Sequence, residues 1–227
     1  MDRHIEVELK ELKEKMLAMG GYVEQAIKDS TDALIQRAPE RLLRVHQIEE
    51  TINHAHIEVD ELCLALLARQ APVAADLRMV LAIIKINTDL ERMGDQATNI
   101  AHNTKDYLAQ VPLTPFPAIA PMADIVTSMV RDALDAFMRT DAKLASDVLR
   151  RDDQVDTFKN EIFRELIRIM KTNPSLVESA MDIILVARNL ERLGDHATNI
   201  AEDAIFAYTG QDIRHRPRTE NVRKVSF

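Results

Sequence analysis

Two carboxylates one helical turn apart occur twice in this chain, inside a repeated block of twelve residues. The block Leu90–Ala101 recurs 100 residues later with ten of its twelve positions identical, so Glu91 and Asp95 correspond to Glu191 and Asp195. Residues four apart share one face of a helix, and two like charges there cost about 0.2–0.5 kcal/mol unless a cation lies nearby. The repetition of this cost in both copies points to a cation site.

Each copy carries two further features at the same place. A glycine lies inside each acidic pair, Gly94 and Gly194, although a mid-helix glycine costs about 1 kcal/mol relative to alanine. The preceding helix of each unit supplies a second polar pair at the matching point, namely Glu49 with Asn53 and Asp152 with Asp156. Each unit therefore gathers about four oxygen-bearing side chains from two neighbouring helices.

The chemistry of these side chains favours hard metal ions. No cysteine or histidine is common to both copies, so the predicted ligands are all oxygen atoms. Such a set suits magnesium, calcium or manganese, or iron in a carboxylate-bridged cluster, and zinc is a further candidate. We expect the metal on the bundle surface, because the Glu-x-x-His pairs of buried di-iron bundles are missing.

A solvated acidic surface is the alternative interpretation. The heptad pattern places Glu91 and Asp95 beside the helix seam and toward solvent, where charged residues need no ligand. His54, His56 and His102 lie on the same helices and are candidates for outer ligands, or are ordinary surface histidines.

Long helices must position these residues. The chain has eight prolines, five glycines, no tryptophan and 4% aromatic residues, which argues against a β-rich fold. Apolar residues such as Ile83, Ile86, Leu90 and Met93 recur at alternating spacings of three and four, as in antiparallel bundles. We therefore predict an all-α fold of two tandem three-helix bundles related by internal duplication.

The predicted boundaries follow the prolines. The first bundle spans residues 1–110, a proline-rich linker spans 111–121, the second bundle spans 122–210, and a basic tail, expected to be flexible, spans 211–227. Helices are expected at about 2–36, 39–69, 74–108, 122–139, 141–171 and 175–208.

Composition excludes several classes of protein. The formal net charge of -8 disfavours nucleic-acid binding, which requires a basic face. The longest apolar run, Leu62–Ala68, is far shorter than the roughly 20 residues of a membrane span. A single cysteine, Cys63, excludes an internal disulfide framework. We expect a cytoplasmic protein.

The duplicated Leu-Glu-Arg-x-Gly-Asp-x-x-x-x-Ile block resembles the signature of the PhoU family of phosphate-system regulators. The segments Met19–Glu24, Asp76–Arg78 and Gly210–His215 resemble family segments too, so the similarity covers about residues 5–215. The resemblance implies two three-helix bundles with metal clusters held on their surface by E(D)xxxD motifs. Carried onto this sequence, the motif positions are Glu49/Asn53, Glu91/Asp95, Asp152/Asp156 and Glu191/Asp195.

The resemblance also implies a function. Family members are cytoplasmic, commonly dimeric, and reach the membrane through their partners. They repress the phosphate regulon when phosphate is plentiful, through the ATPase subunit of the phosphate-specific ABC transporter and a membrane sensor histidine kinase. This sequence departs from the motif at Asn53, whose amide oxygen can ligate a cation but brings no charge. We therefore expect the first unit to bind metal more weakly, or to hold fewer metal ions, than the second.

Three hypotheses follow from these observations. The first is a metal-binding helical adaptor that represses phosphate uptake and has no catalytic activity. The second is a carboxylate-bridged metalloenzyme, since mixed carboxylates can hold two metals about 3.5–4 Å apart. The third is a metal-free helical scaffold whose acidic stripes are solvated faces.

Overall fold

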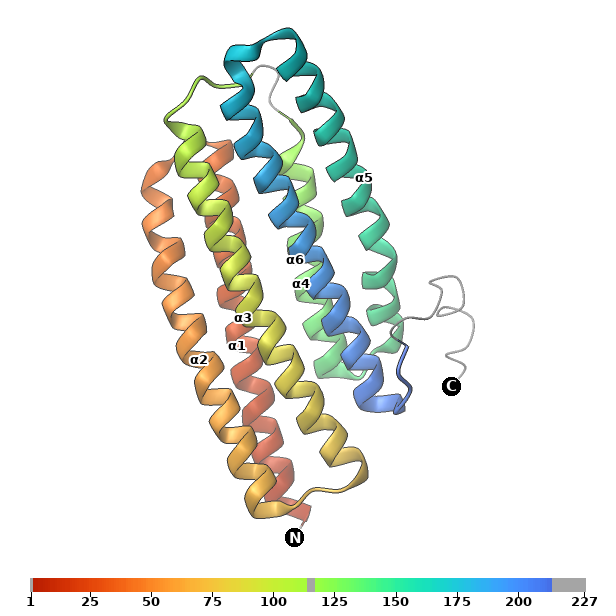
Figure 1. The fold of residues 1–227 in the computed structure, drawn as a ribbon. Helices are drawn as coiled ribbons and strands as arrows, with labels where there is room; N and C mark the ends of the chain where they lie inside the picture. Colours follow the sequence, from red (N-terminus) through yellow and green to blue (C-terminus); the bar gives the residue numbers. More distant parts are fainter. Residues whose placement is uncertain (1, 114–116, 214–227) are drawn as a thin grey trace.

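The computed structural model describes residues 2–113 and 117–213, and its regular elements are all helical (Figure 1). The six α-helices of these ranges are α1 (Asp2–Ile35), α2 (Leu42–Gln70), α3 (Ala74–Leu108), α4 (Ile119–Arg139), α5 (Ala142–Thr172) and α6 (Val177–Thr209). Short 3-10 turns, η1 (Pro39–Arg41) and η2 (Pro174–Leu176), precede α2 and α6. The predicted all-α fold is confirmed. None of the described helices combines the length and apolar character needed to cross a bilayer.

The structure moves two predicted helix starts by three residues. The helix expected from 39 begins at Leu42, because residues 39–41 form the 3-10 turn η1. Helix α4 begins at Ile119, so residues 119–121 of the predicted linker are helical. The buried side chains of Ile119 and Met122 anchor this first turn in the core. Pro121 is tolerated there because the N–H groups of a first turn have no intrahelical partner. The prediction of helix from 122 was therefore three residues late.

The start of the predicted tail also differs from expectation. Residues 211–213 leave the helix but stay on the protein, because Ile213 is buried in the core. Gly210 makes this exit with a left-handed φ of 68°, which glycine adopts without steric cost. The rest of the predicted tail, 214–227, lies outside the described residues.

The two three-helix units share one core. Helices α1–α3 form the first unit and α4–α6 the second, and the units pack through α3 against α6 and α1 against α4 (Figure 1). The α3–α6 contact is the most extensive between any two described helices. The predicted heptad positions from Ile83 to Ile100 and from Ile183 to Ile200 are all buried in this core. Helices α2 and α5 lie at the two outer edges.

Polar contacts fix how α3 sits against α6. The Oδ1 atom of Asp89 lies 2.7 Å from Nδ1 of His196 and accepts a hydrogen bond from Asn199 at 3.2 Å. One turn away on α3, Lys85 donates to Asp203 at 2.9 Å. Both aspartates are buried, and a buried carboxylate needs such partners. These pairs therefore specify one alignment of the two units.

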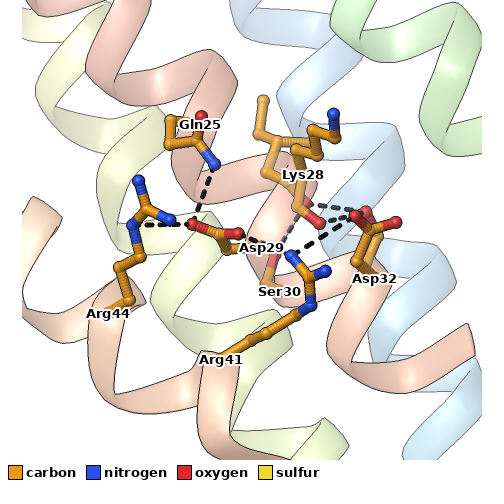
Figure 2. Close-up of polar contacts among 9 residues, drawn as sticks. Gln25, Lys28, Asp29, Ser30, Asp32, Arg41 and Arg44 are labelled. Carbon is orange, nitrogen blue, oxygen red and sulfur yellow. Dashed lines mark hydrogen bonds and ion pairs between the residues drawn. The ribbon is translucent and has the colours of Figure 1, made fainter. Parts of the chain in front are cut away.

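Another buried carboxylate, Asp29, ties α1 to the start of α2 (Figure 2). It accepts hydrogen bonds from Gln25 at 2.9 Å and from Arg41 at 3.2 Å, and Nε of Arg44 lies 3.4 Å from its Oδ2 atom. Arg41 also lies 3.7 Å from Asp32. Because the Asp29 side chain is only 1% exposed, its charge is balanced by these guanidinium groups and not by water.

We predict that Asp29→Ala lowers the free energy of unfolding by about 2 kcal/mol, since it removes a buried acceptor of charge-assisted hydrogen bonds. Asp132 is the matched control, because it occupies the corresponding place in α4 and pairs with Arg151 while 31% exposed. Asp132→Ala should cost no more than about 1 kcal/mol. Urea denaturation of both variants measures the difference, and equal losses would contradict the role given to Asp29.

Candidate metal site

The two repeated glycines differ in how closely the neighbouring helix approaches them. A Cβ atom on Gly94 of α3 would lie 3.1 Å from Cδ1 of Ile52 on α2, closer than side chains normally pack. A Cβ atom on Gly194 of α6 would lie 3.5 Å from Cγ1 of Val155 on α5, an ordinary contact. The glycine at position 94 thus has a packing reason, whereas Gly194 has room for a methyl group.

In the first unit the predicted residues come together between α2 and α3. We call Glu49, Asn53, Glu91 and Asp95 the first acidic group. Asn53 donates a hydrogen bond to Oε1 of Glu49 at 2.9 Å. Desolvation and the charge of Asp95 raise the pKa of Glu91, and desolvation and the charge of Glu49 raise the pKa of Asp95. The carboxylates are therefore close enough to repel one another.

In the second unit the predicted residues meet between α5 and α6. We call Asp152, Asp156, Glu191 and Asp195 the second acidic group. Partial desolvation, followed by the charges of Glu191 and Asp152, raises the pKa of Asp195 to about 6. Here the crowding of negative charge makes the neutral carboxyl easier to form.

The second acidic group contains a cation that the sequence analysis did not single out. The Lys159 ammonium donates to Oδ1 of Asp156 at 2.6 Å and to Oε1 of Glu191 at 2.8 Å. Desolvation lowers the pKa of Lys159, but its hydrogen bonds to Asp156 and Glu191 outweigh this, and the pKa is raised. The signal was present in the sequence, because Lys159 follows Asp156 by three residues and so shares its helix face.

Both acidic groups lie at the protein surface. Glu91 and Glu191 are half-buried, and Asp95 and Asp195 are exposed, which agrees with the heptad prediction. Asp152 is the buried member of the second group. As the side chains stand, no three His, Cys, Asp or Glu residues within 2–113 and 117–213 are arranged to hold a metal ion.

Comparison with known proteins identifies the family of the chain. The PhoU domain matches residues 16–104 and again residues 119–204. The chain belongs to the PhoU family. The two matches confirm the tandem duplication, and the second begins where α4 begins.

The relatives of this PhoU-family chain match it along nearly its whole length. A phosphate-specific transport system accessory protein PhoU homolog from Pseudomonas putida is 39% identical over 217 residues, covering 95% of this chain and 84% of that protein. A homolog with the same name from Aquifex aeolicus is 37% identical, covering 92% and 95% respectively.

Two solved PhoU structures share the fold. The crystal structure of PhoU from Pseudomonas aeruginosa superposes with a TM-score of 0.86 at 37% identity, covering 91% of this chain and 99% of that one. The crystal structure of the phosphate transport system regulatory protein PhoU from Streptococcus pneumoniae gives 0.83 at 27% identity, covering 92% and 99%. The two-bundle architecture of the PhoU family is thus confirmed for this chain.

The residues of the two acidic groups fit a metal ion to different degrees. Both groups offer oxygen ligands, the type that hard cations prefer, and both hold carboxylates whose mutual repulsion a metal would relieve. In the second group, however, Lys159 already provides a positive charge between two of the four carboxylates. The first acidic group is therefore the better fit.

The candidate outer ligands among the histidines have other contacts. His56 places Nδ1 3.3 Å from the carbonyl oxygen of Asn87 and Nε2 3.5 Å from Asp60. The His102 ring lies against His46 with their centroids 5.2 Å apart. His54 is exposed on α2. Of these three histidines, His56 lies near enough to the first acidic group for its charge to lower the pKa of Glu91.

The glycine contacts predict opposite effects of the same substitution in the two units. Gly194→Ala should raise the free energy of unfolding by about 0.5–1 kcal/mol through helix propensity. Gly94→Ala should gain nothing or lose stability, because the new methyl crowds Ile52. Val155 faces Gly194 where Ile52 faces Gly94, so Ile52→Val makes the first unit resemble the second. In this background Gly94→Ala should raise the free energy of unfolding as Gly194→Ala does. Chemical denaturation measures all three, and equal gains at both glycines would contradict the close approach.

We predict that Asp195→Asn stabilises the metal-free protein increasingly as the pH rises. Since the pKa of Asp195 is raised to about 6, the folded protein binds more protons than the unfolded chain between the ordinary aspartate pKa and this value. The contribution of Asp195 to the free energy of unfolding therefore falls as the pH rises through that interval. The variant lacks this loss, so its advantage in denaturation with a chelator should grow from about pH 4 to pH 6. A constant difference would count against the raised pKa.

Proposed function

We propose that this chain is a cytoplasmic accessory protein that represses phosphate uptake and the phosphate regulon, without catalytic activity of its own. The observation that carries the proposal is the match to phosphate-specific transport system accessory proteins along nearly the whole of this chain. The two acidic groups retain the positions that the family resemblance assigns to metal motifs. Both copies of the duplicated unit therefore carry an acidic group.

The adaptor role requires surfaces that contact other proteins. Helix α2 lies at the edge of the body and exposes Leu43, Ile57 and Leu64. Spacings that are multiples of seven place these three side chains along one outward line of the helix. Exposed apolar side chains in such a line are suited to a protein partner. On α5 the residue that corresponds to Leu64 is Ile167, which is also exposed. The residues of α5 that correspond to Leu43 and Ile57 are polar, so α5 has no such apolar line.

The proposed partners are the ATPase subunit of a phosphate ABC transporter and a membrane sensor histidine kinase, with the chain itself forming a homodimer. Contact with the membrane would come only through these partners, and no nucleic acid is involved. In this arrangement the chain reports the state of the transporter to the kinase by binding both.

A metal ion is the proposed structural cofactor of the acidic groups. When bound, it would supply positive charge that neutralises carboxylates on α2 and α3, or on α5 and α6. The side chains that would hold it are those of the two acidic groups. The metal-free scaffold is the second candidate, and the ammonium of Lys159 favours it for the second unit, because part of that group is already neutralised. The metalloenzyme alternative would require turnover that disappears in Glu191→Ala.

Deleting the gene should raise the expression of phosphate-uptake genes several-fold in high phosphate, as measured with a transcriptional reporter, and the wild-type chain should restore repression. Ile57→Glu/Leu64→Glu should fail to restore it, because two charges interrupt the apolar line of α2. Ile167→Glu is the matched control and should complement fully. Unchanged repression in the deletion strain would refute the regulatory role, and full complementation by the α2 variant would refute only the assigned surface.

A further inference from the structure

The two acidic groups are related by the internal duplication but are not neutralised in the same way. On α2 and α5 corresponding residues are 103 positions apart, so Glu49 matches Asp152 and Asn53 matches Asp156. By the same offset, Lys159 matches His56. One unit therefore has a lysine where the other has a histidine, three residues after the acidic motif.

The lysine points into its group. Its ammonium bridges Asp156 on its own helix and Glu191 on α6, at 2.6 and 2.8 Å. The Lys159 and Glu191 side chains are 20% and 24% exposed, so water screens this ion pair less than it screens an open surface pair. A single positive charge thus joins α5 to α6 at the place where a metal ion would do so.

The histidine lies near its group, but its ring contacts other residues. Nδ1 of His56 faces the Asn87 carbonyl, and Asn87 in turn donates to the His56 carbonyl at 2.9 Å and to Asp60 at 2.9 Å. Asn87 is fully buried, so this network holds the ring toward Asp60. Within the described residues, Glu91 and Asp95 have no hydrogen bond or ion pair to a cation, although His56 and Arg92 lie near enough to influence Glu91.

The two groups have the same formal charge, although one contains an amide and the other a lysine. The first group contains three carboxylates and the neutral Asn53, whereas the second contains four carboxylates and the ammonium of Lys159. Both therefore carry the same formal charge of -3. In the first group Asn53 donates a hydrogen bond to Glu49 at 2.9 Å, and within the described residues no ammonium or guanidinium is hydrogen-bonded to Glu91 or Asp95. In the second, an incoming metal must displace an ammonium that makes two short ion pairs.

We infer that Lys159 is a built-in cation that competes with a metal ion for the second acidic group, so that the first acidic group binds metal more tightly. This inference rests on the metal-binding part of the proposed function. It reverses the order expected from Asn53 alone, because the loss of one carboxylate ligand matters less than the presence of a competing positive charge.

The affinity of each group is measured by titrating the full-length, chelator-stripped chain with Mn²⁺ and following free Mn²⁺ by electron paramagnetic resonance. Glu91→Gln/Asp95→Asn disables the first group and leaves the second as the reporter. Glu191→Gln/Asp195→Asn does the reverse. We expect the first group to bind Mn²⁺ on the order of tenfold more tightly than the second. Tighter binding by the second group would overturn the inference.

Adding Lys159→Met to the protein with a disabled first group should raise the Mn²⁺ affinity of the second group on the order of tenfold. Lys143→Met is the matched control, because Lys143 is an exposed lysine of the same helix and its loss changes the net charge equally. Without metal, Lys159→Met should also lower the melting temperature more than Lys143→Met, since four carboxylates then face one another.

The outcomes separate the inference from the function on which it rests. If both lysine variants bind Mn²⁺ equally, Lys159 does not compete and the inference is wrong, while metal binding stands. Circular dichroism checks that each variant is folded. If neither the wild-type chain nor any folded variant, Lys159→Met included, binds Mn²⁺, the metal-binding part of the proposed function is wrong as well. Repression of phosphate-uptake genes is scored independently in both cases.

Discussion

The antiparallel packing of α3 against α6 is the contact on which the rest of this structure depends. It joins the two duplicated units into one body with a continuous core. Because both helices use their heptad positions for this core, the residues one step past those positions face outward toward α2 and α5. The acidic groups therefore form where α3 meets α2 and where α6 meets α5, beside the core residues Ile52 and Val155.

The duplicated framework tolerates local divergence where packing does not forbid it. Ile52 fills the space against Gly94, whereas the smaller Val155 leaves room beside Gly194. The same freedom operates on charge, because an amide at position 53 and an ammonium at position 159 bring the two groups to equal formal charge. A duplicated protein can in this way keep its helices in register while its two halves acquire different affinities for a cation.

Such an asymmetry suits a regulatory protein better than an enzyme. In the proposed function, a cation bound at the first acidic group would neutralise carboxylates on both α2 and α3, the helix pair that carries the exposed apolar line. In the second acidic group, Lys159 bridges Asp156 of α5 and Glu191 of α6 without any metal. One half of the molecule would thus respond to metal while the other half keeps a fixed shape.

The sequence by itself determined the helices, the duplication and the eight residues of the two acidic groups, because heptad spacing and an identical block are local properties of the chain. It placed α3 with both of its ends correct and missed the first turn of α4, where buried Ile119 outweighed the signal of Pro121. Only the tertiary structure decided that Lys159 turns into its group while His56 turns away toward Asn87. That choice depends on contacts between different helices, and spacing along one helix carries no information about them.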